Sequence, residues 1–91
     1  MKKISIICEY YPDEEFTQAD GFDEALLGTY YDKIGGEYRL TYSRQKCIDI
    51  LMKRDEMTEE EANEYFDFNV EGAYIGGRTP VWVDDTMFDN E

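Results

Sequence analysis

The chain has 91 residues, which is enough for one hydrophobic core but not for two, so a single domain is expected. It carries 22 acidic and 9 basic residues, which gives a formal net charge of -13. Because 42% of the residues are hydrophobic and 15% are aromatic, the composition excludes a disordered acidic chain. The same charge opposes direct binding to nucleic acid or to an anionic membrane, and it favours a basic protein partner.

The amino-terminal third predicts one strand and one helix. Residues 3–11 (KISIICEYY) are rich in β-branched and aromatic side chains and end at Pro12, a pattern typical of a strand followed by a turn. A polar and acidic stretch follows. Between residues 22 and 31 the apolar side chains fall at helical spacing, which predicts a short helix. Its apolar positions are Phe22, Ala25, Leu26 and Tyr30.

The middle of the chain predicts a strand that leads into a helix. Gly35 and Gly36 are expected to end the preceding helix in a turn, and residues 37–42 (EYRLTY) alternate like a strand with one buried face. Ser43 is a good N-cap for the next helix. That helix has one apolar stripe and a basic last turn that suits the helix dipole. The stripe consists of Cys47, Ile48, Leu51 and Met52, and the basic residues are Lys53 and Arg54.

The carboxyl-terminal part begins with the helix start that the sequence specifies best. Thr58 and Glu61 match a capping box, and Met57 and Ala62 occupy the positions of a hydrophobic staple. The helix is expected to run from Thr58 to about Tyr74. A turn at Gly76 and Gly77 then leads through Pro80 into a short strand at residues 81–83.

These elements predict an α+β fold, in which a small antiparallel sheet packs against a helix pair in the order strand, helix, strand, helix, helix, strand. Residues 1–84 are expected to form the single acidic domain, and residues 85–91 an acidic, frayed tail.

The two cysteines, Cys8 and Cys47, lie among aliphatic neighbours and not in a CxxC pair. This arrangement favours two buried, reduced thiols over a disulfide or a metal site. The apolar run that follows the Met-Lys-Lys start ends at Glu9. This run is too short for a signal peptide or a membrane span. The protein is therefore expected in the cytoplasm.

The sequence contains no histidine, so it lacks the side chain most often used for acid–base catalysis near neutral pH and the commonest metal ligand. None of the carboxylates is paired in sequence with a nucleophile, and neither glycine pair is followed by the lysine of a phosphate-binding loop. The expectation is a protein that is not an enzyme and that needs no cofactor or metal.

Several motifs follow one another in the last three quarters of the chain: a tyrosine-led helix, a Glu-Glu-Ala helix, a Phe-Asn-x-x-Gly-Ala-Tyr stretch and a Gly-x-x-Thr-Pro turn into a strand. Their positions are Tyr42, Glu60, Glu61, Ala62, Phe68, Asn69, Gly72, Ala73, Tyr74, Gly76, Thr79 and Pro80. Together with residues 22–28 (FDEALLG), this pattern resembles a family of small bacteriophage-encoded proteins. The chain departs from the pattern at Glu56, where the family usually has glycine before the methionine. The resemblance implies a phage origin and a bacterial host cell.

The charge is unevenly distributed along the chain. Residues 55–91 contain 12 acidic side chains and one basic side chain, Arg78, whereas residues 1–54 contain 10 acidic and 8 basic ones. Four carboxylates of the second helix recur at intervals of four, three and four residues, which places them on one face. This acidic stripe consists of Glu60, Glu64, Asp67 and Glu71.

A row of carboxylates at this interval resembles the phosphates of a nucleic acid strand, so the leading hypothesis is charge mimicry. The protein would inhibit a bacterial defence complex of the anti-CRISPR or anti-restriction type by occupying its nucleic-acid-binding surface. Tyr65, Tyr74 and Trp82 are candidate anchors beside the stripe, although each could instead belong to the core. The stripe itself could also be only a solvated face.

The alternatives come from other classes. One is a structural module that forms homodimers or larger assemblies when the strands at residues 4–11 or 81–83 pair with another copy. Another is an accessory protein that binds a host protein without mimicking nucleic acid.

Overall fold

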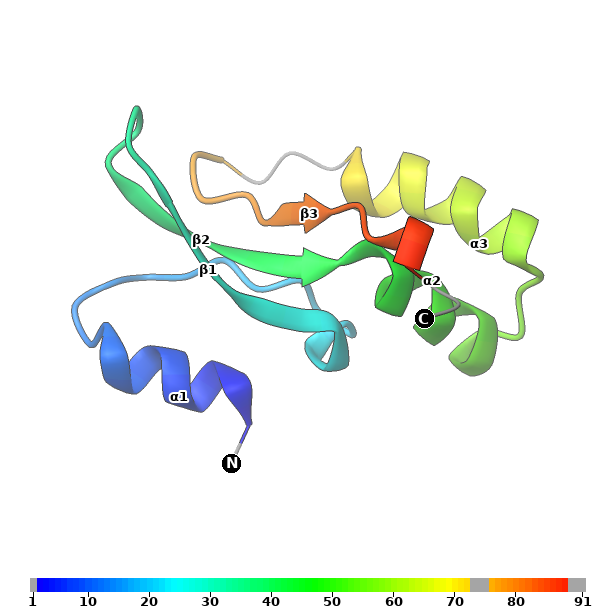
Figure 1. Cartoon of the computed structure of the whole chain (residues 1–91), viewed down its shortest axis with the longest axis horizontal. Coiled ribbons are helices and arrows are strands. Elements are labelled where there is room, and N and C mark those ends of the chain that lie inside the picture. Colours follow the sequence, from blue (N-terminus) through cyan, green and yellow to red (C-terminus); the bar gives the residue numbers. More distant parts are fainter. Residues whose placement is uncertain (1, 73–75, 89–91) are drawn as a thin grey trace.

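A computed structural model describes residues 2–72 and 76–88 of the chain (Figure 1). It confirms the α+β class, with a three-stranded sheet and three α-helices in these residues. The element order is helix, strand, strand, helix, helix, strand, so the predicted types of the first two elements are wrong. The elements are α1 (Lys3–Tyr10), β1 (Leu26–Asp32), β2 (Glu37–Ser43), α2 (Arg44–Arg54), α3 (Glu59–Tyr65) and β3 (Val81–Val83).

The predicted amino-terminal strand is the helix α1. Ile4 and Ile7, three residues apart, are its half-buried apolar residues and pack against the core, which is helical and not strand-like spacing. The strand preference of β-branched residues depends on a neighbouring strand to pair with, and here packing along β1 replaces pairing. The helix ends before Pro12, because the residue before a proline is pushed out of the helical region; Tyr11 has φ -128 and ψ 67.

The predicted helix over residues 22–31 is mostly strand β1. Phe22, Ala25 and Leu26 are buried, but Phe22 is the N-cap of a short 3-10 turn, η1 (Asp23–Ala25), Ala25 ends that turn, and Leu26 is the first residue of the strand. From Gly28 onward the chain contains Thr-Tyr-Tyr, which suits a strand, and Tyr30 is largely exposed. The helical spacing of the apolar residues at positions 22–26 therefore corresponds to a single 3-10 turn, and the helix predicted over residues 22–31 does not continue beyond it.

Strand β2 is confirmed and occupies the centre of the sheet. It pairs antiparallel with β1 and parallel with β3, so the sheet is mixed and not purely antiparallel. The turn between β1 and β2 is closed by Asp32, whose Oδ1 accepts hydrogen bonds from the N–H groups of Ile34 and Gly35. Gly36 takes φ 69, a left-handed conformation that glycine adopts without steric cost. Parallel pairing of β2 with β3 requires a long crossover, which α2 and α3 provide.

Both helices of the crossover begin as predicted. The Ser43 side chain accepts a hydrogen bond from Lys46 N–H at the start of α2. The capping box of Thr58 and Glu61 is fully formed at the start of α3. The α-helical hydrogen bonding of α3 ends at Tyr65, and the chain continues as a π-helical segment, η2 (Phe66–Glu71). The predicted end near Tyr74 lies outside the described residues.

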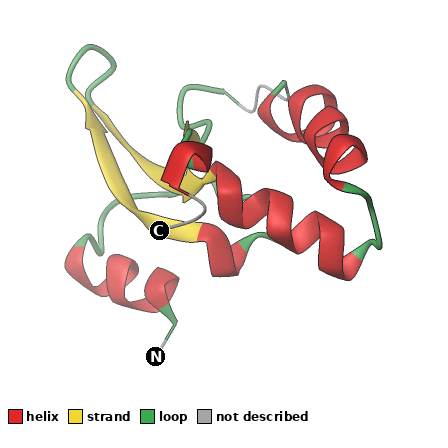
Figure 2. Cartoon of the chain, turned by 45° about the vertical axis from the view of Figure 1, so that its right-hand side comes forward, coloured by secondary structure: helices red, strands yellow, loops and turns green. Residues whose placement is uncertain are grey.

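The core lies where β2, α2 and α3 meet the turn that precedes β1. Leu40 and Tyr42 of β2 pack with the predicted stripe of α2 and with Phe66, and Tyr42 accepts a hydrogen bond from Ala19 N–H at 3.0 Å. Helix α1 lies along β1, while α2 and α3 occupy the opposite end of the long axis (Figures 1 and 2). No helix in the described residues is both long and apolar enough to cross a membrane.

The first residues of the expected tail are not frayed. Residues Thr86–Phe88 form a 3-10 turn, η3. Asp85 Oδ2 accepts a hydrogen bond from the Ser43 hydroxyl at 2.6 Å, and its Oδ1 accepts one from Gln45 N–H at 2.9 Å. Partial burial by itself would raise the pKa of Asp85, but these hydrogen bonds outweigh it and the pKa is lowered. Asp85 thus acts as a second cap on α2, contributed from the end of the chain.

We expect Asp85→Asn to lower the free energy of unfolding by about 1 kcal/mol at neutral pH, because the cap loses its charge. Because the pKa of Asp85 is lower in the folded state than in the unfolded chain, its ionised side chain stabilises the fold at pH values above the ordinary pKa of 3.8. This stabilisation is lost as the pH falls below that value. Urea unfolding of both proteins from pH 7 to pH 3 measures this, and a difference that stays constant over the whole range would contradict the assignment.

The prediction of two buried thiols is half correct. Cys47 is buried and Cys8 is exposed on α1, and both are free. Burial raises the pKa of Cys47 to about 12, so this thiol stays protonated at neutral pH.

We therefore expect a thiol reagent to modify Cys8 rapidly in the native protein and to leave Cys47 unmodified until the chain unfolds. Peptide mapping by mass spectrometry after a short reaction with iodoacetamide at pH 8 distinguishes the two sites. Equal rates at both cysteines would contradict the placement of Cys47 in the core.

Candidate partner-binding surface

The acidic stripe lies on α3 and its continuation η2, and all four of its carboxylate residues are exposed. The structure separates the stripe into two halves with different surroundings. Asp67 and Glu71 face an arginine of α2, whereas Glu60 and Glu64 make no ion pair or side-chain hydrogen bond within the described residues.

The paired half is organised by Arg44, the first residue of α2. Its Nη2 lies 2.8 Å from Asp67 Oδ1 and its Nη1 lies 3.0 Å from Glu71 Oε2. Nη2 also donates to Asn63 Oδ1 at 3.1 Å, and the guanidinium lies over the Phe66 ring at 4.6 Å from its centre. The Arg44 side chain is only 16% exposed, so these contacts are partly shielded from water. This half of the stripe therefore joins α3 to α2.

The unpaired half of the stripe, Glu60 and Glu64, lies on the first turns of α3 together with Glu59, which is outside the stripe. Glu59, Glu60 and Glu64 are exposed, and their carboxylates have no partner among the described residues. Glu61 is also exposed, but its Oε1 accepts the Thr58 N–H of the capping box. Negative charge at a helix amino terminus is favoured by the helix dipole, so the cluster is compatible with a stable α3. We call Glu59, Glu60 and Glu64 the free set.

The link between α2 and α3 extends this acidic surface. Asp55 is paired with the adjacent Arg54 at 3.1 Å, and that hydrogen bond lowers the pKa of Asp55. Glu56 is exposed and has φ 54, in the left-handed region that favours glycine. The chain therefore carries a carboxylate at a position whose backbone conformation favours glycine.

The three candidate aromatic anchors have different positions. Tyr65 is exposed on α3, and Tyr74 lies outside the described residues. Trp82 is half-buried and packs against Tyr42 and Phe66, with ring centres 5.2 and 5.3 Å away. Trp82 therefore contributes to the core, and of the three candidates Tyr65 is the one that the structure places on the acidic helix α3.

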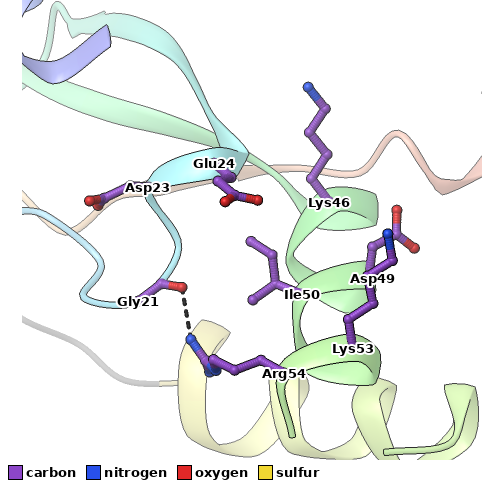
Figure 3. Close-up of a pocket in the computed structure, with 8 residues that line it drawn as sticks. All are labelled: Gly21, Asp23, Glu24, Lys46, Asp49, Ile50, Lys53 and Arg54. Carbon is purple, nitrogen blue, oxygen red and sulfur yellow. Dashed lines mark hydrogen bonds between the residues drawn. The ribbon is translucent and has the colours of Figure 1, made fainter. Parts of the chain in front are cut away.

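A separate groove of about 720 Å³ lies between α2 and the turn before β1 (Figure 3). Arg54 closes one end of it by donating from Nη1 to the Gly21 carbonyl at 2.9 Å. The groove contains three basic and three acidic side chains, which largely compensate one another. Its lining residues are Gly21, Asp23, Glu24, Lys46, Asp49, Ile50, Lys53 and Arg54.

Arg44 is the residue of this surface that the sequence reasoning missed. A signal for it existed, because a basic side chain in the first turn of a helix opposes the helix dipole. Its position in α2 therefore indicated another partner, but the sequence could not say which of the many carboxylates it was.

Among residues 2–72 and 76–88, no three cysteine or acidic side chains are grouped closely enough to hold a metal ion. No family model matches the chain, and neither a curated protein nor a solved structure is significantly similar to it. The interpretation of the surface therefore depends on its own chemistry.

We expect Arg44→Gln to lower the free energy of unfolding by about 1–2 kcal/mol, since two ion pairs and a ring contact are lost together. Lys53→Gln removes the same charge from the same helix at an exposed position and should change stability by less than about 0.5 kcal/mol. Denaturant unfolding of both variants tests this. Equal effects would show that Arg44 contributes only its net charge.

Proposed function

We propose that this chain is a non-catalytic inhibitor that binds the basic, nucleic-acid-binding surface of another protein through the carboxylates of α3 and the preceding link. The resemblance to phage-encoded proteins supports a target in a bacterial defence complex, of the CRISPR or restriction type, in the cytoplasm of the host. The protein would compete with DNA or RNA and would not bind either directly.

The observation that carries the proposal is the charge density at the start of α3. Glu59, Glu60, Glu61 and Glu64 are all exposed and span five residue steps of a helix, or about 7.5 Å. This is about one charge per 2 Å, close to the one charge per roughly 1.7 Å along duplex DNA. A protein that binds phosphates through clusters of Lys and Arg would encounter a similar density of negative charge on this surface.

The conformation of Glu56 supplies independent support. A non-glycine residue in the left-handed region costs on the order of 1 kcal/mol, and Glu56 has no hydrogen bond or ion pair within the described residues to offset that cost. Strain of this kind persists where a side chain serves something other than stability. The carboxylate of Glu56 would have such a role, because it extends the acidic surface into the link between α2 and α3.

The paired half of the stripe changes which carboxylates are assigned to the partner. Asp67 and Glu71 already share an ion pair with Arg44, so a basic target would have to compete with Arg44 for them. The carboxylates of the free set and of Glu56 could bind a basic target without breaking an existing ion pair. The proposal therefore centres on the link and the first turns of α3, with Tyr65 beside them as an aromatic contact.

We expect the triple variant Glu59→Gln, Glu60→Gln and Glu64→Gln to keep its stability and to lose inhibition by well over tenfold. Close charge pairs across an interface couple by roughly 1.5 kcal/mol or more, whereas on the helix the relief of like-charge repulsion offsets the lost interaction of Glu59 and Glu60 with the helix dipole. The measurement is the plating efficiency of a phage on strains that carry one defined CRISPR or restriction system and express the chain.

A matched control replaces Asp13, Glu15 and Asp20 by their amides. These residues are exposed on the loop before η1, and the change in net charge is the same. If control and triple variant lose activity equally, only overall charge matters. If the native chain restores plating on no defended strain and forms no complex with a nucleic-acid-binding protein, the proposed function is wrong.

A further inference from the structure

One arginine of the chain is bound to the acidic stripe, and its contacts show which chemistry the stripe can hold. Asp67 and Glu71 are four residues apart, and the guanidinium of Arg44 reaches both of them through different nitrogen atoms. The same guanidinium lies over the Phe66 ring. A planar group with several fixed donors can bridge two carboxylates and stack on a ring at the same time, which the compact ammonium of a lysine cannot do. The two carboxylates and the ring therefore form an arginine site.

A second pair of carboxylates with the same spacing lies two turns earlier on the stripe. Glu60 and Glu64 are also four residues apart, which places their side chains on neighbouring turns of α3, about 5–6 Å apart at Cβ. Both residues are exposed, and neither has an ion pair or a side-chain hydrogen bond within the described residues. This pair thus offers the same two acceptors as the first pair, without a bound cation.

An exposed ring follows the second pair along the helix. Phe68 lies four residues after Glu64, and four residues are about one turn both in an α-helix and in a π-helical segment such as η2. Glu60, Glu64 and Phe68 therefore follow one another along one ridge of α3 and η2. Phe68 is 79% exposed, so core packing does not account for its ring. An arginine stem or guanidinium can pack against such a ring.

The arginine for this second site has to come from another molecule. The chain contains four arginines, and each of them already has a carboxylate partner within the chain. The four are Arg39, Arg44, Arg54 and Arg78.

We propose that Glu60, Glu64 and Phe68 bind an arginine side chain of the target protein. The guanidinium bridges the two carboxylates, as that of Arg44 does two turns later, and the aliphatic stem lies against the ring. This site rests on the proposed function and specifies the chemistry of the partner: the target binds this helix through arginine more tightly than through lysine.

The first test compares two peptides of equal charge, hexa-arginine and hexa-lysine. Each is titrated into the purified full chain by isothermal titration calorimetry at about 150 mM NaCl, where long-range attraction to the acidic surface is screened. We expect hexa-arginine to bind at least about fivefold more tightly, because a lysine ammonium does not bridge both carboxylates and stack on the ring. Equal affinities of the two peptides overturn the inference.

Two matched pairs of charge variants locate the preference. Glu60→Gln with Glu64→Gln removes the carboxylates of the site, and Asp13→Asn with Glu15→Gln removes the same charge from the exposed loop before η1. The first pair should weaken hexa-arginine by about fivefold or more and abolish its advantage over hexa-lysine. The second pair should keep that advantage. Equal effects of the two pairs would mean that arginine binds through overall charge, and the site would be rejected.

The ring gives a readout that a change in charge does not move. Phe68→Leu keeps an apolar side chain and removes the ring, and Phe88→Leu is the control at an exposed ring outside α3 and η2. We expect the first variant to weaken hexa-arginine by about threefold with little effect on hexa-lysine, and the second to change neither. No loss with Phe68→Leu, or the same loss with Phe88→Leu, contradicts the proposed contact with the ring.

The peptide titrations and the plating assay can fail separately. An arginine preference that depends on Glu60, Glu64 and Phe68, in a chain that restores plating on no defended strain, would support the site and reject the proposed target. Restored plating together with equal binding of the two peptides would support the inhibitor and reject the arginine site.

Discussion

The carboxyl-terminal half of the molecule depends on two consecutive residues at the junction of β2 and α2. Ser43 is fully buried, caps α2 through its side chain and donates to Asp85. Arg44 follows it and binds Asp67 and Glu71. Residues 55–91 contain one basic side chain against twelve acidic ones, so this segment cannot neutralise itself. The junction supplies the donors and the cation that hold the segment against the core.

This constraint separates the acidic side chains into two kinds. Asp67, Glu71 and Asp85 have partners at the junction and serve the fold, while the free set has none within the described residues. A carboxylate that is already paired offers little to a basic partner, because the existing ion pair must first be broken. Glu56 on the link and the free set on α3 therefore keep carboxylates without a partner among the described residues, and the proposed recognition uses these.

Local signals predicted the fold where they were strong. The N-cap of Ser43 and the capping box of Thr58 and Glu61 placed α2 and α3, and alternation placed β2. The amino-terminal third was predicted wrongly, because residues 3–11 suit a strand only beside another strand and instead pack on β1 as a helix. Two helices between β2 and β3 also implied a parallel pair, which the antiparallel prediction overlooked.

The exposure of the acidic stripe was predicted, but the pairing of its members was not. Helical spacing placed the acidic stripe on one helix, and the structure confirms that its members are exposed. The pairing of half of it could not be derived from spacing, since Arg44 meets Asp67 and Glu71 across 23 and 27 residues. Such contacts depend on how α2 and α3 pack, and that packing is set by Ala62, Leu51 and Phe66 in the core and not by the charges.

The central claim is that the stripe consists of a held half and a free half, and one comparison of unfolding free energies tests it. The double variant Glu60→Gln with Glu64→Gln removes two charges from α3, and Asp67→Asn with Glu71→Gln removes two charges from its continuation η2. The first pair should change stability by less than about 0.5 kcal/mol, because the relief of like-charge repulsion offsets the lost interaction of Glu60 with the helix dipole. The second pair should lower stability by about 1 kcal/mol, because Arg44 loses its partners. Equal shifts for the two pairs would contradict the division on which the account depends.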